Sequence, residues 1–323
     1  MIISRTPFRV SFVGGGSDFS DFYNKNGTGA VISAAIQQYM YIVIHPYFHD
    51  KIRLKYSRTE DVNDVDAIKH PIFRECLKRV GIEKGIEIAS FADISSGTGL
   101  GSSSSFTVGL LNALYAYKGK TISKSGLAAE ACEIEIDILK EPIGKQDQYA
   151  ASYGNLNHIR FNRDETVDVS PVLISGSVKI KLQKYLRLYY VGGQRKARDL
   201  LGEQKSKISS GTKNYEHLER MLSQVERFKQ SLINNEITNL GSLLDEGWSY
   251  KKKLARGITN KTIDKLYEKS LKYGAKGGKL LGAGGTGFLL IFHEDHEYLS
   301  TRLDCRTLPF TIDREGSKII FYE

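Results

Sequence analysis

The chain has 323 residues, of which 41% are hydrophobic and 26% are charged. The length fits two domains better than one, and the balance is typical of a globular protein. The net charge is +9, but acidic residues are interleaved with the basic ones. This spread argues against a nucleic-acid partner, and anionic small ligands explain a mild basic excess equally well.

The three cysteines lie far apart and in no CxxC pair, which argues against a disulfide framework or a zinc site. The N-terminal apolar stretch is interrupted by Arg5, Pro7 and Arg9, too early for a signal peptide. The longest apolar run, 39–44, is far shorter than the ~18–20 residues that span a bilayer. We therefore expect a soluble, cytoplasmic protein without a membrane partner.

The first part of the chain alternates strand-like and helical patterns. Apolar alternation predicts strands at 8–13, 30–35, 39–45, 52–56 and 86–91. Helical spacing predicts helices at 70–80, 106–117 and 123–139, and a short helix that opens near Gly144. The charged segment 58–69 reads as a loop.

The pattern changes after a strand predicted at 186–191. Long helical patterns cover 213–233, 238–253 and 260–273, and strands follow at 288–292 and 319–322. No internal repeat is present. We place a boundary near 170–185, which gives an N-terminal domain at 1–175 and a C-terminal domain at 176–323.

A Gly/Ser-rich run precedes the helix predicted at 106–117. Glycines let a backbone approach a ligand closely, and the free N–H groups and dipole of a helix start favour phosphate. An ordinary helix cap explains one serine and one glycine, but not the three glycines and four serines of 97–105. The candidate nucleotide-binding residues are Ser96, Gly97, Gly99, Leu100, Gly101, Ser102, Ser103 and Ser104.

Two commoner nucleotide motifs do not account for this run. The Walker A pattern GxxxxGK[ST] is absent from the sequence. A GxGxxG occurs at Gly282, Gly284 and Gly287, but a helix is predicted before it and a strand after it. A dinucleotide fingerprint needs the opposite order, and this one lies too late for a full domain.

The segment 96–104, Ser-Gly-Thr-Gly-Leu-Gly-Ser-Ser-Ser, resembles the central motif of the GHMP kinases. Segments 5–18 and 279–288 are similar to the first and third motifs of that family, and they occur in the same order. The resemblance implies a two-domain α/β (α+β) fold, with a ribosomal-S5-like N-terminal domain and a ferredoxin-like C-terminal domain. It also implies an active site between them, ATP as donor and Mg²⁺ as cofactor.

Phosphoryl transfer needs positioning, charge neutralisation and often a base. Asp147 begins a predicted helix, so its residue type and place alone indicate a helix cap at least as readily as a base. The resemblance implies that Asp147 is the catalytic base. It also implies Arg9 as the cation beside that carboxylate, with Lys145 as a second candidate.

Glu135 lies on the helix before Asp147, where a lone carboxylate usually belongs to a solvated surface. The resemblance implies that Glu135 is a magnesium ligand together with the hydroxyl of Ser103, with Ser104 as the rival. One carboxylate and one hydroxyl are sufficient, because magnesium takes hard oxygen ligands and completes its shell with phosphates and water.

Substrate contacts are expected around the first and third motifs. Asp18 follows a triple glycine, where it is either a turn residue or a hydrogen-bond partner of substrate hydroxyls. Arg195 and Arg198 could hold a substrate phosphate, although surface charge explains either one alone. The candidate substrate residues are Gly15, Gly16, Ser17, Asp18, Gly284, Gly285 and Arg195.

The acceptor is indicated by resemblance only. Galactokinases carry Glu-His where this chain has Gly15-Gly16, which argues against galactose. Segments 8–18 and 141–151 most resemble a bacterial branch, the D-glycero-D-manno-heptose 7-phosphate kinases. That resemblance implies phosphorylation of the C1 hydroxyl to the 1,7-bisphosphate, a precursor of GDP-heptose and surface polysaccharide. A fucokinase-like sugar 1-kinase and a non-catalytic sugar/ATP sensor are the alternatives, and monomer and dimer stay open.

Overall fold

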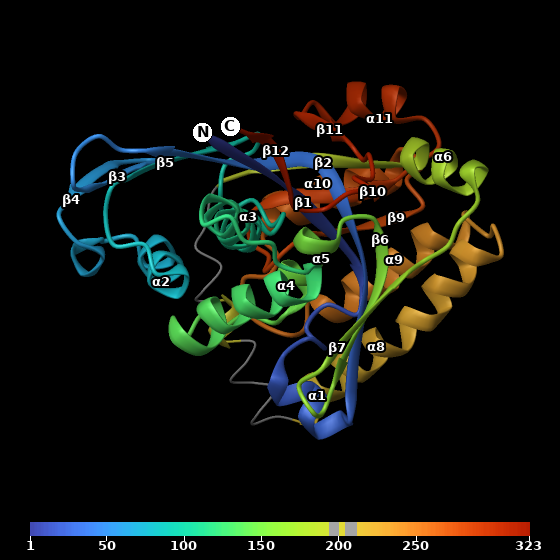
Figure 1. Ribbon diagram of the computed structural model, residues 1–323. Helices are drawn as coiled ribbons and strands as arrows, with labels where there is room; N and C mark the ends of the chain where they lie inside the picture. The colour runs from blue at the N-terminus through green and yellow to red at the C-terminus, as the bar shows by residue number, and fades with distance from the viewer. Residues whose placement is uncertain (194–199, 204–211) are drawn as a thin grey trace.

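Two β-sheets organise the part of the chain that the computed structural model describes, residues 1–193, 200–203 and 212–323 (Figure 1). The larger sheet has eight strands, with the order β12-β1-β2-β5-β3-β4 and with β6 and β7 branching from β2. Its pairs are antiparallel except β3 with β5. The strands are β1 (Ile2–Val13), β2 (Thr28–Pro46), β3 (Ile52–Lys55), β4 (Thr59–Val62), β5 (Ile86–Ala92), β6 (Leu156–Asn162), β7 (Val167–Pro171) and β12 (Lys318–Tyr322).

Strand β2 runs without a break for 19 residues, where the sequence predicted two strands. One side of β2 pairs with β1 over nearly its whole length. On the other side, the segment 28–34 pairs with β6 and 40–46 pairs with β5. The prediction of two strands was wrong because β1 pairs with β2 on both sides of a bulge at Gln37 and Gln38, where the N–H of Gln37 donates to the carbonyl of Thr311.

Helices cover one face of the larger sheet. They are α1 (Ser20–Asn26), α2 (Pro71–Val80), α3 (Ser102–Tyr117), α4 (Lys124–Cys132), the π-helical turn Glu133–Ile138 and α5 (Gln146–Tyr153). Helix α3 packs against β1 and β2 and is buried along most of its length. It begins four residues before the predicted start, since the serines of the Gly/Ser run form its first turn.

The segment 58–69, predicted as a loop, contains β4 and a short 3-10 turn at Val65–Ala67. The carboxylate of Glu60 orders it by accepting the backbone N–H of Lys69 at 2.6 Å and of His70 at 3.1 Å. The prediction failed because these partners lie nine and ten residues away from Glu60, outside any local pattern.

The smaller sheet has the order β11-β8-β10-β9. Its strands are β8 (Leu186–Gly192), β9 (Gly277–Leu280), β10 (Gly287–Phe292) and β11 (Thr307–Pro309), and its helices are α6 (Gly176–Tyr185), α8 (Thr212–Ile233), α9 (Asn239–Lys251), α10 (Lys261–Lys272) and α11 (His296–Leu303). The sequence did not predict α6 or α11, which bury few apolar residues.

The GxGxxG segment connects β9 to β10, and these two strands pair antiparallel. A strand therefore precedes it directly, where the sequence predicted a helix. The exclusion of a dinucleotide site holds, since no helix follows the glycines.

Aromatic side chains join the two halves of the molecule. Phe12, at the end of β1, stacks on Phe228 of α8 with ring centroids 5.3 Å apart and meets the edge of Phe310 at 5.6 Å. Strand β12 pairs with β1, so the last strand of the chain belongs to the larger sheet and the two termini lie side by side (Figure 1). Within the described ranges, no helix is both long and apolar enough to cross a bilayer.

Phe12→Ala should lower the free energy of unfolding by about 3–5 kcal/mol, because it empties a buried aromatic contact between the two halves. Urea denaturation measures this change. Phe48→Ala is the matched control, since Phe48 is 96% exposed and its loss should change stability by less than about 0.5 kcal/mol. Equal effects of the two substitutions would contradict the role given to Phe12.

Candidate active site

A pocket lies where the end of β1 and the loop after it meet the start of α5 and the β9–β10 connection. The side chains and backbone that line it come from both halves of the chain. They are Arg9, Ser11, Gly15, Gly16, Asp18, Phe19, Ile143, Gly144, Gln146, Asp147, Leu201, Met221, Lys251, Lys279, Gly282 and Ala283. The structure thus gathers residues that are up to 274 positions apart in the sequence, from 9 to 283.

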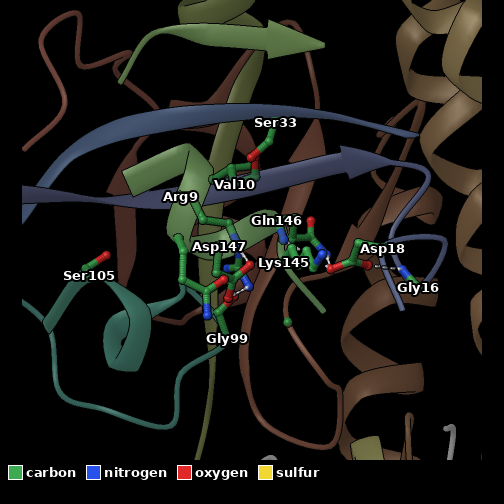
Figure 2. Close-up of polar contacts among 12 residues, drawn as sticks. Arg9, Val10, Gly16, Asp18, Ser33, Gly99, Ser105, Lys145, Gln146 and Asp147 are labelled. Atoms are coloured by element: carbon green, nitrogen blue, oxygen red, sulfur yellow. Dashed lines mark hydrogen bonds and ion pairs between the residues drawn. The ribbon is translucent and has the colours of Figure 1, made fainter. Parts of the chain in front are cut away.

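Arg9 and Asp147 form a two-pronged ion pair in this pocket (Figure 2). Nε of Arg9 donates to Oδ1 of Asp147 at 2.6 Å, and Nη2 donates to Oδ2 at 2.7 Å. The remaining guanidinium nitrogen, Nη1, donates to the backbone carbonyl of Gly99 at 2.7 Å. Arg9 therefore fixes both the orientation of the carboxylate and its distance from the Gly/Ser loop.

Lys145 does not contact Asp147. Its ammonium donates to the carboxylate of Glu165 and lies over the ring of Tyr23. The pairing of Lys145 with Asp147 that the sequence allowed is therefore not formed, because Glu165, at the β6–β7 turn, attracts the lysine to the other side of the chain. Arg9 is the cation that pairs with Asp147 in the described structure.

The Gly/Ser loop approaches the β9–β10 connection backbone to backbone. Gly97, Gly99 and Gly101 have positive φ angles of 77°, 81° and 75°. A Cβ on Gly99 would lie 2.6 Å from the carbonyl oxygen of Leu281, so no side chain fits there. Leu100 buries its side chain in the core, and its carbonyl accepts the backbone N–H of Arg9 at 3.0 Å.

Glu135 lies behind the start of α3 and is only 1% exposed. Its carboxylate accepts the Ser103 hydroxyl at 2.9 Å and Nε2 of Gln148 at 2.6 Å, and Ser104 is also within hydrogen-bonding reach. Burial raises the pKa of Glu135 to about 7, although these hydrogen bonds by themselves lower it. No cation pairs with this carboxylate in the described ranges.

This environment fits a magnesium ion. One carboxylate and one hydroxyl are hard oxygen ligands, and a buried carboxylate without a cation gains from a divalent charge. The described part of the chain has no group of three metal-ligating side chains, so phosphate oxygens and water would complete the shell. Sequence reasoning missed Gln148, although a second glutamine in the helix start Gln-Asp-Gln was the available signal.

Asp18 faces the pocket from the loop after β1 and is 3% exposed. Oδ1 accepts the N–H of Gly16 at 2.9 Å, and Oδ2 accepts Nε2 of Gln146 at 3.2 Å (Figure 2). Burial, and then the nearby charge of Asp147, raises the pKa of Asp18. Gly144 touches the same carboxylate, and a Cβ there would lie 2.0 Å from Oδ2.

Other predicted substrate residues lie elsewhere. Ser17 donates its hydroxyl to the carbonyls of Gly14 and Ala30 and holds the loop itself. Gly284 and Gly285 pack against Ile258 and do not line the pocket, where Gly282 and Ala283 take that place. Arg195 and Arg198 lie outside the described residues.

Four polar side chains of the pocket were not singled out from the sequence. They are Ser11, Gln146, Lys251 and Lys279. The Ser11 hydroxyl and Oε1 of Gln146 are buried and accept or donate no hydrogen bond within the described structure. The only sequence signal for the lysines was position, since Lys279 begins the third motif and Lys251 begins a run of three lysines.

Two segments of the chain match known domains. Residues 67–155 match the GHMP kinases N terminal domain, and residues 228–299 match the GHMP kinases C terminal domain. These matches contain the Gly/Ser loop with Asp147 and the glycines of the β9–β10 connection.

Full-length relatives are similar over most of this chain. A D-glycero-alpha-D-manno-heptose 7-phosphate kinase of Campylobacter jejuni is 27% identical, over 90% of this chain and 89% of that protein. A bifunctional fucokinase/GDP-fucose pyrophosphorylase of Arabidopsis thaliana is 26% identical, over 90% of this chain but only 30% of that protein. The fold matches the crystal structure of a D-glycero-D-manno-heptose 1-phosphate kinase of Bacteroides thetaiotaomicron, with a TM-score of 0.81, 22% identity and full coverage of both chains.

Glu135→Gln should stabilise the ligand-free protein in a pH-dependent way. The folded pKa of Glu135, about 7, lies above its ordinary value of 4.5. Ionisation of this buried group therefore lowers the free energy of unfolding increasingly as pH rises from about 4.5 to 7, and the loss is complete above pH 7. The variant should melt roughly 2–5 °C higher than the wild type at pH 8, and the difference should shrink towards pH 5.

Thermal unfolding at several pH values measures this difference. Asp137→Asn is the control, because Asp137 lies in the same π-helical turn but is exposed. A pH-independent gain for Glu135→Gln, or an equal gain for Asp137→Asn, would contradict the burial argument.

Proposed function

Because the chain belongs to the GHMP kinase family and is a sugar kinase that uses ATP as donor, we propose that its acceptor is D-glycero-D-manno-heptose 7-phosphate. The product would be the 1,7-bisphosphate, formed by phosphorylation of the C1 hydroxyl. The observation that carries the reaction is the Arg9–Asp147 pair, which faces Asp18 across one pocket beside the Gly/Ser loop. We place the reaction in the cytoplasm, where the three free cysteines would stay reduced.

One similarity supports a heptose as the acceptor, and one difference from galactokinases argues against galactose. The Campylobacter jejuni relative, similar along nearly its whole length, is a heptose 7-phosphate kinase. Gly15 and Gly16 of the first motif line the pocket, where galactokinases carry Glu-His. A heptose bisphosphate would feed GDP-heptose synthesis for surface polysaccharide, which is part of the same proposal.

Asp147 supplies the base in the proposed mechanism. The acceptor hydroxyl gives its proton to the carboxylate of Asp147 as its oxygen bonds to the γ-phosphorus. The bond between that phosphorus and the β,γ-bridging oxygen breaks, and ADP leaves. Arg9 holds the carboxylate at a fixed place relative to the loop, so that little reorganisation is needed during transfer.

The other groups position the two substrates. The Gly/Ser loop offers backbone N–H groups at the start of α3 to the phosphates of ATP. Glu135 and Ser103 would hold a magnesium ion, which when bound neutralises phosphate charge. Asp18 and the free Oε1 of Gln146 hydrogen-bond hydroxyl groups of the sugar.

Asp147→Asn should lower kcat by about 10²–10⁴-fold, because the amide cannot accept the hydroxyl proton. A coupled assay of ADP release measures turnover, and nucleotide titration should show that ATP still binds. Asp168→Asn, an exposed carboxylate on β7, is the control. Near-normal turnover by the Asp147→Asn variant would contradict the role of Asp147 as the base.

The acceptor itself is tested with a panel of heptose 7-phosphate, heptose 1-phosphate, free heptose, fucose and galactose. We expect the highest kcat/KM for heptose 7-phosphate. A preference for an unphosphorylated sugar would overturn the proposed acceptor and favour a fucokinase-like enzyme, while leaving the kinase reaction in place.

Gly144→Ala should raise the KM for the sugar about 10-fold or more, since the new methyl group collides with Asp18 and displaces a hydrogen-bonding carboxylate. Nucleotide affinity should change little. Gly176→Ala is the matched control, because a Cβ there meets no atom within 4 Å. An unchanged KM for the sugar in Gly144→Ala would contradict the proposed role of Asp18 in binding the acceptor.

A further inference from the structure

Two buried lysines line the pocket from the C-terminal half. Lys251, the last residue of α9, is 9% exposed, and Lys279 of β9 is 4% exposed. Nζ of Lys251 donates to the carbonyls of Leu280 at 2.8 Å and Gly282 at 2.5 Å. Nζ of Lys279 donates to the carbonyl of Phe12 at 2.7 Å. Neither lysine has a carboxylate partner within the described ranges.

Buried ammonium groups that contact only neutral carbonyls are costly. Burial lowers the pKa of Lys279 to about 7 and that of Lys251 well below its usual value. The positive charge of Arg9 lowers both further, and Lys279 acts on Lys251 in the same direction. Buried, unpaired charged groups that line a pocket cost folding free energy, and they are typical of sites that bind a ligand of opposite charge.

The lysines lie on the side of the pocket that borders the Gly/Ser loop. Gly282, whose carbonyl Lys251 holds, packs on the Gly/Ser loop, and a Cβ there would lie 2.4 Å from Cα of Gly99. Arg9, whose charge acts on both lysines, binds Asp147 and the carbonyl of Gly99. The Ser11 hydroxyl lines the same pocket, is 7% exposed and has no partner in the described structure.

We propose that Lys251 and Lys279, with the Ser11 hydroxyl, form a cationic subsite that binds the phosphoryl group as it passes from ATP to the acceptor. This inference rests on the kinase reaction above and not on the identity of the sugar. The transferred group spreads negative charge over three oxygens, and fixed cations in a site with little water stabilise that charge strongly. The lysines form no covalent bond, and the proton of the acceptor still goes to Asp147.

Kinetics of methionine variants test the subsite. Lys251→Met and Lys279→Met remove one ammonium each and keep an unbranched side chain, so we expect them to fold. At saturating ATP and sugar, kcat should fall about 10²–10³-fold while both KM values change less than about 3-fold. Lys253→Met is the matched control, because it removes the same charge at an exposed position two residues away and should keep wild-type kcat.

Proton uptake gives a readout that a purely structural lysine would not change. An approaching phosphoryl group favours the charged form of both lysines, so the wild type should take up protons on binding a non-hydrolysable magnesium–ATP analogue at pH 8. Calorimetry in buffers of different ionisation enthalpy counts these protons. Asp18, Asp147, Arg9 and Glu135 are unchanged in every variant, so the loss of uptake in each Lys→Met variant isolates the lysines.

Three results would overturn the proposal. Wild-type kcat in both variants would exclude a role in transfer. A higher KM for the sugar phosphate alone, with kcat unchanged, would assign the lysines to the acceptor's own phosphate. A loss of kcat with a lower melting temperature and unchanged proton uptake would assign them to tethering the β9–β10 connection. Failure of the proposed acceptor is separate, because the comparison then runs on whichever sugar the wild type phosphorylates.

Discussion

The site depends on one arginine that holds three segments together. Arg9 lies in β1 opposite Ala35 of β2, and its side chain is 6% exposed. Its planar guanidinium donates to both carboxylate oxygens of Asp147 and to the carbonyl of Gly99, while the backbone N–H of Arg9 donates to the carbonyl of Leu100. A lysine could not hold this geometry, since it offers a point charge instead of a fork. Strand β1 thus sets the distance between the carboxylate of Asp147 and the Gly/Ser loop.

The second constraint is contact between backbones without side chains. Gly99 meets the carbonyl of Leu281, and a Cβ on Gly287 would lie 2.1 Å from the carbonyl oxygen of Thr98. The two halves of the molecule therefore touch at the Gly/Ser loop itself, where any larger residue would separate them. This contact places the lysines of α9 and β9 opposite the carboxylates of the N-terminal half.

Charged groups of both signs are buried in the pocket and behind the start of α3, and most of them lack a partner of opposite charge within the described residues. Burial raises the pKa values of Asp18 and Glu135 and lowers those of Lys251 and Lys279. Each group costs stability in the free protein, and each matches a part of the proposed ligands: hydroxyls, a metal ion and a phosphoryl group. Arg9 and Asp147, in contrast, form an ion pair with each other without any ligand. This pairing orients the carboxylate of Asp147 before the substrate binds.

The sequence determined the features that depend on neighbours along the chain. The glycines at 97, 99 and 101 permitted left-handed backbone in a loop before a helix, and three motifs in order indicated the family and its two-part fold. Resemblance also named Arg9, Asp147 and Glu135, which the structure places around the same loop.

Tertiary structure alone decided which partner each charge meets. Lys145 is two residues from Asp147 in the sequence, but it pairs with Glu165. Lys251 and Lys279 line the pocket and have no carboxylate partner among the described residues. The same holds for β2, which is continuous because β1 pairs with it on both sides of the bulge at Gln37 and Gln38, while β6 and β5 pair with its two ends. Burial and pairing are set by segments far apart in the chain, so no local pattern carries them.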